Sequence, residues 1–188
     1  MSSDFAPVPG GIPTAFAATA PRDLCTDCGI SRTADAKCCG RAYQFIKPDY
    51  ETLEHRVHGR ARDPSRTEEV HFGPFRRMVR ARLASPKPGA QWTGITSRIG
   101  ERLLEPGAVD AVLTMAPDPH NSWRPMPVLV TKSGDMAKCR GMRMGYAPLL
   151  ALLEPARDAG HKRIAVIGIP CQVYALRSLE LELGFEKV

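Results

Sequence analysis

Four of the six cysteines of the chain lie close together near its N-terminus, at Cys25, Cys28, Cys38 and Cys39. Thiols at that density form disulfides, hold a zinc ion, act as a redox dithiol or ligate an iron–sulfur cluster. Each of these sites requires a different compartment and a different surrounding structure. This cluster of cysteines therefore restricts the fold and the chemistry more than any other feature of the sequence.

The rest of the sequence favours a cytoplasmic protein, in which disulfides are uncommon. The N-terminal residues lack the basic start and unbroken apolar run of a secretory signal. No stretch of about eighteen apolar residues occurs, so we expect no membrane span. The 188 residues and the apolar fraction of 43% allow a sizeable core in one or two domains. In a reducing cytosol, clustered cysteines more often bind metals or act in redox chemistry.

The spacing of the cysteines leaves iron–sulfur ligation and zinc binding as the leading interpretations. Cys25 and Cys28 form a C-x2-C pair, in which two intervening residues let both sulfurs approach one metal centre. Cys38 and Cys39 are adjacent, and because neighbouring side chains diverge, we expect only one of them to share that centre. A zinc ribbon would repeat the C-x2-C pair, and a thioredoxin-like dithiol would follow an apolar strand. Neither pattern is present.

Composition divides the N-terminal half into three segments. Residues 1–22 are rich in Pro, Gly, Ala and Thr without a period, and we expect them to form a flexible leader. Residues 23–52 form a cysteine-rich iron–sulfur module in this interpretation, and residues 53–88 a basic connecting segment. Eight arginines and three acidic residues lie between positions 55 and 82, which accounts for most of the formal net charge of +6.

The basic segment has three interpretations. Nucleic-acid binding is the least favoured, because only two phenylalanines are available for stacking on bases. Clustered arginines also dock acidic proteins or phosphate groups, and a solvated surface is equally compatible with the pattern. Within the segment, FGPFRRMVRARL (residues 72–83) is predicted to be helical, with Phe75, Met78, Val79 and Leu83 on one apolar face.

From residue 89 onward, helical and strand patterns alternate. The predicted strands are residues 109–115, 125–131 and 164–167, and the predicted helices are residues 93–105, 146–160 and 171–184. This alternation predicts an α/β domain over residues 89–188, with a mostly parallel sheet and flanking helices. Loops at the carboxyl ends of such strands are the usual places for ligands.

One such loop, GIPCQV (residues 168–173), places Cys171 at the start of a helix. Gly168 and Pro170 allow a tight turn from strand to helix, and the dipole of the helix favours a thiolate at this position. Cys171 is therefore interpreted as a metal ligand, a nucleophile or a small buried apolar residue. Cys139 has no partner at a ligand spacing and is interpreted as a core residue. A G-x-G-x-x-G turn, typical of dinucleotide binding, is absent.

Several motifs together resemble the coenzyme F-420 hydrogenase/dehydrogenase beta-subunit family, and within it the chlorophyll-pathway branch. They are the C-x2-C pair, VHGRAR (57–62), PGAQWTGI (88–95), the VDAVL strand and GIPCQVYALRSLE (168–180). The resemblance covers residues 21–188. The combination of GAQWTG and GxPCQV is specific for this branch and its near relatives, although neither motif is specific by itself.

The resemblance implies a flavoprotein that carries 4Fe-4S clusters and FAD and receives electrons from ferredoxin. It implies that Cys25, Cys28 and Cys39 ligate a cluster and that Cys171 lies beside the cofactors as a further metal ligand. The residues expected to bind the flavin are Gln91, Trp92, Thr93, Gly94, Gly168, Pro170 and Gln172. The glycine-rich turn at residues 89–94 would let the backbone approach a cofactor, and the arginines would dock acidic ferredoxin or a cofactor phosphate.

The chain departs from the family pattern in two ways. Tyr43 occupies a position where relatives are expected to have a cysteine, and tyrosine is a poor ligand for a 4Fe-4S cluster. Either Cys38 replaces that ligand, or the cluster is labile or lost. The chain is also shorter than the relatives and stops at GFEKV. We therefore expect an incomplete flavin-binding domain, with further cysteines and much of the substrate pocket beyond it.

The expected activity is reduction of the 8-vinyl group of divinyl (proto)chlorophyllide, a tetrapyrrole of chlorophyll biosynthesis and photosynthesis. A first alternative is another reductase of the family, acting on 7-hydroxymethyl chlorophyll or on the deazaflavin coenzyme. A second alternative is a zinc-stabilised binding module. The flavin would deliver hydride and an acid would supply a proton; the candidates for that acid are Tyr43, His58, His120 and Tyr146. Homo-oligomer formation is left open, and we expect no nucleic-acid partner.

Overall fold

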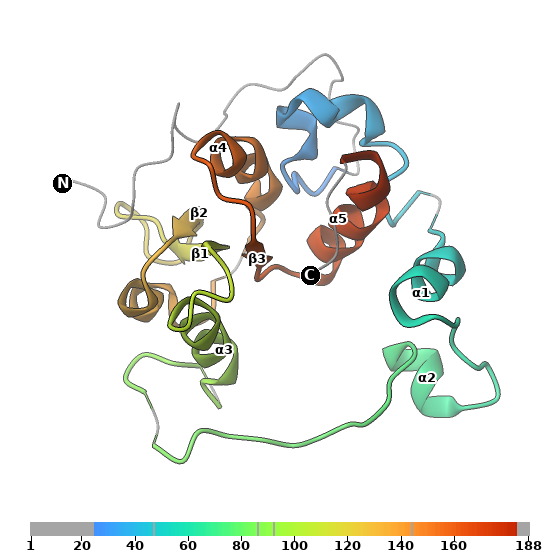
Figure 1. Ribbon diagram of the computed structural model, residues 1–188, viewed down its shortest axis with the longest axis horizontal. Helices are drawn as coiled ribbons and strands as arrows, with labels where there is room; N and C mark the ends of the chain where they lie inside the picture. The colour runs from blue at the N-terminus through green and yellow to red at the C-terminus, as the bar shows by residue number, and fades with distance from the viewer. Residues whose placement is uncertain (1–24, 47, 86, 92, 144, 184–188) are drawn as a thin grey trace.

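A computed structural model describes residues 25–183 except residues 47, 86, 92 and 144 (Figure 1). The expected leader, residues 1–22, lies outside the described residues. The helices are α1 (Tyr50–His58), α2 (Thr67–Phe72), α3 (Ile95–Leu104), α4 (Leu153–Asp158) and α5 (Pro170–Leu183), and the strands are β1 (Ala111–Pro117), β2 (Pro125–Val130) and β3 (Ile164–Val166). Short 3-10 helices are η1 (Ile30–Arg32), η2 (Ala34–Cys38), η3 (Ser133–Cys139) and η4 (Leu149–Leu152). None of the described helices has the length and apolar character needed to cross a membrane.

The sheet has three described strands in the order β2-β1-β3, and it is mixed. Strand β1 pairs antiparallel with β2 and parallel with β3, so that Val112 lies opposite both Val130 and Ala165. The prediction of a mostly parallel sheet is therefore wrong for the β1–β2 pair. The loop between these strands, residues 118–124, is too short for the crossover that a parallel pair needs. Asp118 closes this loop by accepting a 2.8 Å hydrogen bond from the backbone N–H of His120.

Two core layers cover the two faces of the sheet, because successive side chains of a strand point to opposite faces. Leu113 and Leu129 face the layer built by η4, α4 and α5, whereas Val112 and Val130 face Met136 of η3 and the end of α3. Helices α3 and α4 accordingly lie on opposite sides of the β1–β2 pair (Figure 1). The predicted α/β class is confirmed, with a small sheet and flanking helices.

The cysteine-rich segment packs into the first of these layers. Ile30, Cys38 and Ala42 are each at most 3% exposed and share one core cluster with Leu149 and Leu150 of η4. A separate cysteine-rich module is therefore not confirmed. A segment of this length buries too little apolar surface to fold alone, so its 3-10 turns depend on η4 for their packing.

The helix predicted for residues 72–83 is wrong. Helix α2 ends at Phe72, and the following described residues are extended, with Met78 and Val79 exposed by 54% and 69%. Gly73 and Pro74 interrupt the helical pattern, since Gly73 has a φ of 73° and proline restricts the residue before it. The apolar spacing that suggested a helix has no core to pack against.

Helix α3 confirms the helix predicted for residues 93–105. Ile99 is 53% exposed despite its apolar side chain, whereas Gly100 is buried. A Cβ atom on Gly100 would lie 2.5 Å from the methyl carbon of Met136, so glycine lets α3 approach η3 closely. Glu101 is buried beside it and is ion-paired with Arg140, with 2.8 Å between Oε1 and Nη2.

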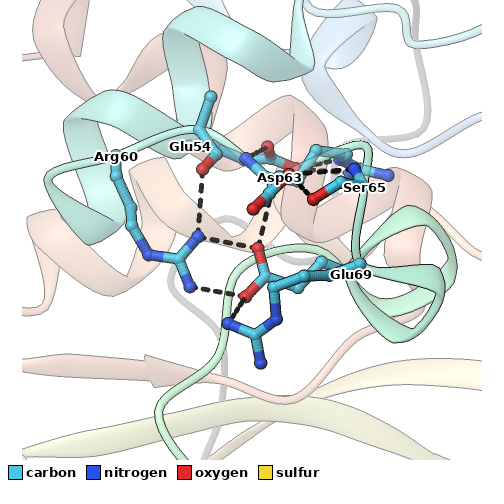
Figure 2. A network of polar contacts seen from close by, with 8 residues as sticks. Glu54, Arg60, Asp63, Ser65 and Glu69 are labelled. Atoms are coloured by element: carbon cyan, nitrogen blue, oxygen red, sulfur yellow. Dashed lines mark hydrogen bonds and ion pairs between the residues drawn. The ribbon is translucent and has the colours of Figure 1, made fainter.

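The first half of the basic segment is folded around two acidic side chains, as Figure 2 shows. The carboxylate of Glu69 has no exposed surface and accepts hydrogen bonds from both Nη atoms of Arg60, at 2.7 and 2.6 Å, and from the backbone N–H of Asp63, at 2.9 Å. Arg66 pairs with the same carboxylate, and Arg62 forms an ion pair with Glu54. These arginines therefore join α1 to α2 and are not available to a partner.

We predict that Glu69→Gln lowers the stability of the fold at neutral pH. Hydrogen bonds from Arg60 and Asp63 lower the pKa of Glu69 from 4.5 to about 2. Because this pKa is lower in the folded than in the unfolded chain, the carboxylate stabilises the fold above pH 4.5 and loses that effect as the pH falls toward 2. Urea unfolding at several pH values should show a lower unfolding free energy for the variant at neutral pH. Its unfolding free energy should also decrease less steeply as the pH falls into the acid range. Glu68→Gln, an exposed neighbour, is the control, and an equal effect of both changes would contradict the prediction.

Candidate functional site

Four cysteines from three separate segments line one cavity, which we call the thiol cavity. Cys25 and Cys28 come from the loop before η1, Cys39 follows η2, and Cys171 is the second residue of α5. The remaining lining residues are Thr26, Ile30, Ser31, Ala42, Tyr43 and Ala175. The structure thus brings together all four residues that the sequence analysis proposed as metal ligands.

The adjacent cysteines Cys38 and Cys39 have different environments. Cys38 is 1% exposed and belongs to the core beside η4, whereas the half-buried Cys39 lines the thiol cavity. The two side chains diverge because η2 ends between them. Cys38 does not line the cavity, so it does not take the place of a ligand expected at position 43. Cys171 instead provides the fourth thiol.

The loop that carries Cys25 and Cys28 is held against η4 by its backbone. The carbonyl of Cys28 accepts a 2.9 Å hydrogen bond from the N–H of Leu150. Gly29 follows with a φ of 108°, and a Cβ atom there would lie 2.3 Å from the backbone nitrogen of Ala151. Only glycine fits this conformation and this spacing. On the other side of the loop, Asp27 has a φ of 45° and is fixed by an ion pair with Arg32.

The electrostatics of the thiol cavity oppose a free thiolate at Cys28. Burial, with smaller contributions from the nearby Cys39, Cys25 and Cys171, raises the pKa of Cys28 to about 12 against the lowering effect of a backbone hydrogen bond from Ile30. The N–H of Asp27 also donates to Sγ of Cys25 over 3.3 Å. Four thiolates packed this closely need a cation to balance them, because like charges in a poorly solvated space destabilise one another.

Tyr43 lines the thiol cavity together with the cysteines and is half-buried. Its ring contacts that of Phe45 edge-on, with 5.6 Å between the ring centroids. Desolvation raises the pKa of Tyr43, and repulsion from Cys25 and Cys171 adds to this effect. The phenol group therefore stays protonated and faces the same space as the thiols.

A second and larger cavity, of about 470 Å³, lies at the carboxyl ends of the parallel strands β1 and β3. We call it the sheet-edge cavity. Its lining includes five residues that the sequence analysis expected at a flavin site, which are Gln91, Thr93, Gly94, Gly168 and Gln172. Trp92 lies outside the described residues, and Pro170 is not among the lining residues. The position matches the place where α/β sheets bind ligands.

Gln172 lines this cavity mainly as a structural residue. It is 2% exposed, its Nε2 donates a 2.9 Å hydrogen bond to the carbonyl of Ala147, and its Oε1 accepts one from the N–H of Ile169. A Cβ atom on Gly168 would lie 2.8 Å from that Oε1. The glycine therefore allows the glutamine to close the turn between β3 and α5.

Sequence reasoning missed several lining residues of the sheet-edge cavity. Thr96 and Ser97 lie in the first turn of α3, and Arg143 comes from the loop after η3. A visible signal for the first two was Gly94, which precedes the helix with a φ of 69° and has no side chain to cap it. The N–H of Ile95 donates to Oγ1 of Thr93 over 3.5 Å, and the amide groups of Thr96 and Ser97 follow in the first turn. For Arg143, the signal was its position between Gly141 and Gly145, because a basic residue in a glycine-bounded loop is a candidate for binding an anionic ligand.

One turn separates the two cavities. Cys171 lines the thiol cavity, whereas Ile169 and Gln172 on either side of Pro170 and Cys171 line the sheet-edge cavity. Consecutive residues at the start of α5 therefore contact both. No three described Cys, His, Asp or Glu side chains surround one point closely enough to hold a single metal ion.

Comparison with known proteins shows to which proteins the chain is similar. Residues 78–154 match the family described as coenzyme F420 hydrogenase/dehydrogenase, beta subunit N-term. Over 183 residues the chain is 36% identical to 7-hydroxymethyl chlorophyll a reductase, chloroplastic, of Oryza sativa subsp. japonica, a match covering 96% of this chain and 37% of that protein. The chain belongs to the coenzyme F420 hydrogenase/dehydrogenase beta-subunit family. The resemblance found in the sequence is therefore confirmed, and the rice reductase supports the chlorophyll-pathway branch.

Two further relatives show how the chain relates to this beta-subunit family. It is 35% identical over 167 residues to an uncharacterised protein of Nostoc sp., covering 89% of this chain and 42% of that protein. It is also 35% identical over 89 residues to a component of the F(420)H(2) dehydrogenase of Methanosarcina mazei, covering 47% of this chain and 25% of that protein. The chain spans about two fifths of the length of the first two curated relatives.

The family match falls on one of the two cavities. Residues 78–154 include α3, β1, β2 and η3, and these elements with their connecting loops supply most of the residues that line the sheet-edge cavity. The cysteines of the thiol cavity lie outside that range but within a chain that matches the rice reductase over 96% of its length. The region that matches the beta-subunit family therefore forms most of the wall of the sheet-edge cavity.

We predict that Gly29→Ala destabilises the fold by about 2–4 kcal/mol, because a Cβ atom adds backbone strain and a clash with η4. Gly59→Ala is the matched control. Gly59 also has a positive φ, of 77°, but nothing lies within 4 Å of an added Cβ atom, so we expect a loss of only about 1 kcal/mol. Urea unfolding of both variants measures the difference, and equal losses would show that Gly29 is not held against η4.

Proposed function

We propose that this chain provides the iron–sulfur and flavin sites of a ferredoxin-dependent oxidoreductase that reduces a chlorophyll-type tetrapyrrole. The observation that carries the proposal is the convergence of four cysteines on one cavity beside a second cavity of cofactor size. Thiolates of four cysteines are the ligand set of a 4Fe-4S cluster. A 470 Å³ cavity at a sheet edge is of the size that cofactor sites have.

The relatives of the chain favour an iron–sulfur cluster over a zinc ion. Zinc would draw the thiolates to within about 2.3 Å of one point, whereas each cysteine of a 4Fe-4S cluster binds a different iron. The match to a reductase supports a redox centre, so we rank the zinc-stabilised binding module below the iron–sulfur site.

The residues around the thiols also suit a bound cluster. Backbone N–H groups of Asp27 and Ile30 donate to the sulfurs of Cys25 and Cys28, and such hydrogen bonds help set the reduction potential of a cluster. The buried, apolar side chains of Ile30 and Ala175 line the cavity beside the sulfurs. Iron would also supply the positive charge that four neighbouring thiolates need.

FAD is the cofactor that we propose for the sheet-edge cavity, where it would supply hydride to a bound substrate. The cavity offers two features for an anionic group such as a phosphate. Thr96 and Ser97, whose amide groups lie in the first turn of α3, line it, and the guanidinium of Arg143 is its one charged group among the described lining residues. Helix N-termini and arginine side chains both bind phosphate.

The turn between the cavities supports electron transfer between the two sites. Cys171 and Gln172 are covalent neighbours that line different cavities. One peptide bond therefore joins Cys171, a proposed ligand of the cluster, to Gln172, a lining residue of the proposed flavin site. In this proposal the chain's own contribution is to hold both cofactors at opposite sides of one rigid turn.

We propose the second half of the basic segment as the docking surface for ferredoxin. Arg76, Arg77, Arg80 and Arg82 are exposed, and within the described part of the chain none has an ion pair or hydrogen bond. The arginines nearer α1 and α2 are already paired with Glu54 and Glu69. Unpaired arginines attract an acidic protein and increase its rate of association.

The substrate proposal is a tetrapyrrole, reduced at the 8-vinyl group of divinyl (proto)chlorophyllide. The match to 7-hydroxymethyl chlorophyll a reductase supports the tetrapyrrole class and makes 7-hydroxymethyl chlorophyll the second candidate. The match to the F(420)H(2) dehydrogenase covers less than half of the chain, so the deazaflavin coenzyme ranks third. Homo-oligomer formation and a cytoplasmic location stay predictions.

We predict that the chain, purified without oxygen after supply of iron and sulfide, holds about four irons and one flavin and bleaches with dithionite. Replacing Cys25, Cys28, Cys39 or Cys171 by Ala should each lower the iron content. Cys38→Ala is the matched control, because Cys38 is adjacent to Cys39 but lies in the core. Iron, sulfide, zinc and flavin analysis of each variant measures the result.

Three outcomes of this experiment would contradict all or part of the proposal. If Cys171→Ala retains all of its iron, Cys171 is not a ligand of the cluster and does not join the two sites. One zinc per chain, with no iron and no flavin, would favour the binding module. A wild-type chain with an intact cluster but no flavin would show that the assignment of the sheet-edge cavity is wrong.

The substrate is tested by single-turnover assays of the reconstituted protein with reduced ferredoxin. We expect loss of divinyl (proto)chlorophyllide to the monovinyl product, measured by chromatography, and no oxidation of the reduced deazaflavin coenzyme. Conversion of 7-hydroxymethyl chlorophyll a alone would replace the first substrate with the second. Changing Arg77 and Arg80 together to Gln should slow the ferredoxin-driven reaction at low salt about tenfold while leaving dithionite-driven turnover unchanged.

A further inference from the structure

One polar group of the thiol cavity has no role in the proposed function. The hydroxyl of Tyr43 belongs to a half-buried side chain that lines this cavity with Cys25, Cys28, Cys39 and Cys171. Its ring is positioned by the edge-on contact with Phe45, at an interplanar angle of 71°. The side chain is therefore held beside the thiols and does not simply extend into solvent.

The hydroxyl of Tyr43 lacks a hydrogen-bond partner among the described residues. The hydroxyl is thus able to donate a hydrogen bond to a group bound in this cavity. Phenols are good donors, and sulfur atoms that carry negative charge are acceptors. The sulfurs are the acceptors that share this cavity with it.

The sulfurs differ in the donors that they already have. Cys25 and Cys28 receive hydrogen bonds from the backbone N–H groups of Asp27 and Ile30. Cys171 has no described donor to its sulfur, although it lies in the first turn of α5. Tyr43, from the segment after Cys39, lines the cavity together with both Cys25 and Cys171.

We propose that Tyr43 donates a hydrogen bond from its hydroxyl to a cysteine sulfur of the bound cluster, most directly that of Cys171, and thereby raises the reduction potential of the cluster. This inference rests on the proposed function of the thiol cavity. Reduction adds negative charge to the cluster and its sulfurs, so a donor stabilises the reduced state more than the oxidised state. Tyr43 is thus a tuning residue and not a ligand.

Two other hydroxyls, of Thr26 and Ser31, line the same cavity. Both belong to the loop and turn that carry Cys25 and Cys28, where backbone donors are already present. A phenol is also more acidic than an aliphatic hydroxyl, and so donates more strongly. These differences assign the role to Tyr43 and make Thr26 and Ser31 the weaker candidates.

The test is a redox titration of the reconstituted chain and its Tyr43→Phe variant, followed by electron paramagnetic resonance of the reduced cluster. Phenylalanine keeps the ring and its contact with Phe45 but removes the donor. We expect the equilibrium constant for one-electron reduction to fall about tenfold, which corresponds to a potential lower by about 59 mV. Tyr50→Phe is the control, because Tyr50 bonds Gln44 and does not line the cavity.

The outcomes separate this inference from the function on which it rests. An unchanged potential in Tyr43→Phe with a full cluster overturns the role of Tyr43 and leaves the proposed function intact. Loss of iron from Tyr43→Phe also overturns it as stated, since the hydroxyl would then anchor the cluster. A wild-type chain without a cluster overturns both. A negative shift in Tyr43→Phe, absent from Tyr50→Phe, at equal iron and sulfide content supports the inference.

Discussion

The contact between the first cysteine loop and η4 is the constraint on which the thiol cavity depends. The hydrogen bond from Leu150 to the carbonyl of Cys28 and the close approach of Gly29 to Ala151 attach a short, weakly helical segment to the main core. Without this attachment, residues 25–43 would have too little apolar surface to hold a fixed shape. The position of Cys25 and Cys28 relative to Cys171 therefore depends on the sheet and its covering helices, and not on the cysteine spacing alone.

The parts of the fold that could be predicted from sequence are those set by local patterns. The three strands and helices α3 and α5 follow from apolar periodicity and from glycines at their ends, which act over a few residues. The antiparallel pairing of β1 and β2 was missed because the pattern of a buried strand is the same for both directions. Residues 72–83 were mistaken for a helix, since an apolar spacing predicts a helix only where a core is present to cover it. The net charge of the basic segment also did not show which arginines have acidic partners. In the structure, Glu54 and Glu69 form ion pairs with the first arginines, and the later arginines are exposed.

The candidate site was predicted in part for a similar reason. Resemblance to a family supplied the cysteines and the glycine-rich turn at residues 89–94 as candidates, but it did not show that Cys171 meets Cys39. That meeting requires the turn after β3 to lie beside the end of η2, which is a long-range packing event. The presence of Arg143 and Ser97 in one cavity likewise depends on the sheet, which brings α3 and the loop after η3 together.

The turn at Gly168–Gln172 contributes residues to the walls of both cavities. If a ligand in one cavity orders this turn, a ligand in the other meets a turn that is already ordered, and the same coupling free energy acts in both directions. Gln172 is the residue through which such coupling would pass, because its amide ties the start of α5 to the carbonyl of Ala147 and to the N–H of Ile169. Assembly of the two cofactors would then be cooperative, with each increasing the retention of the other.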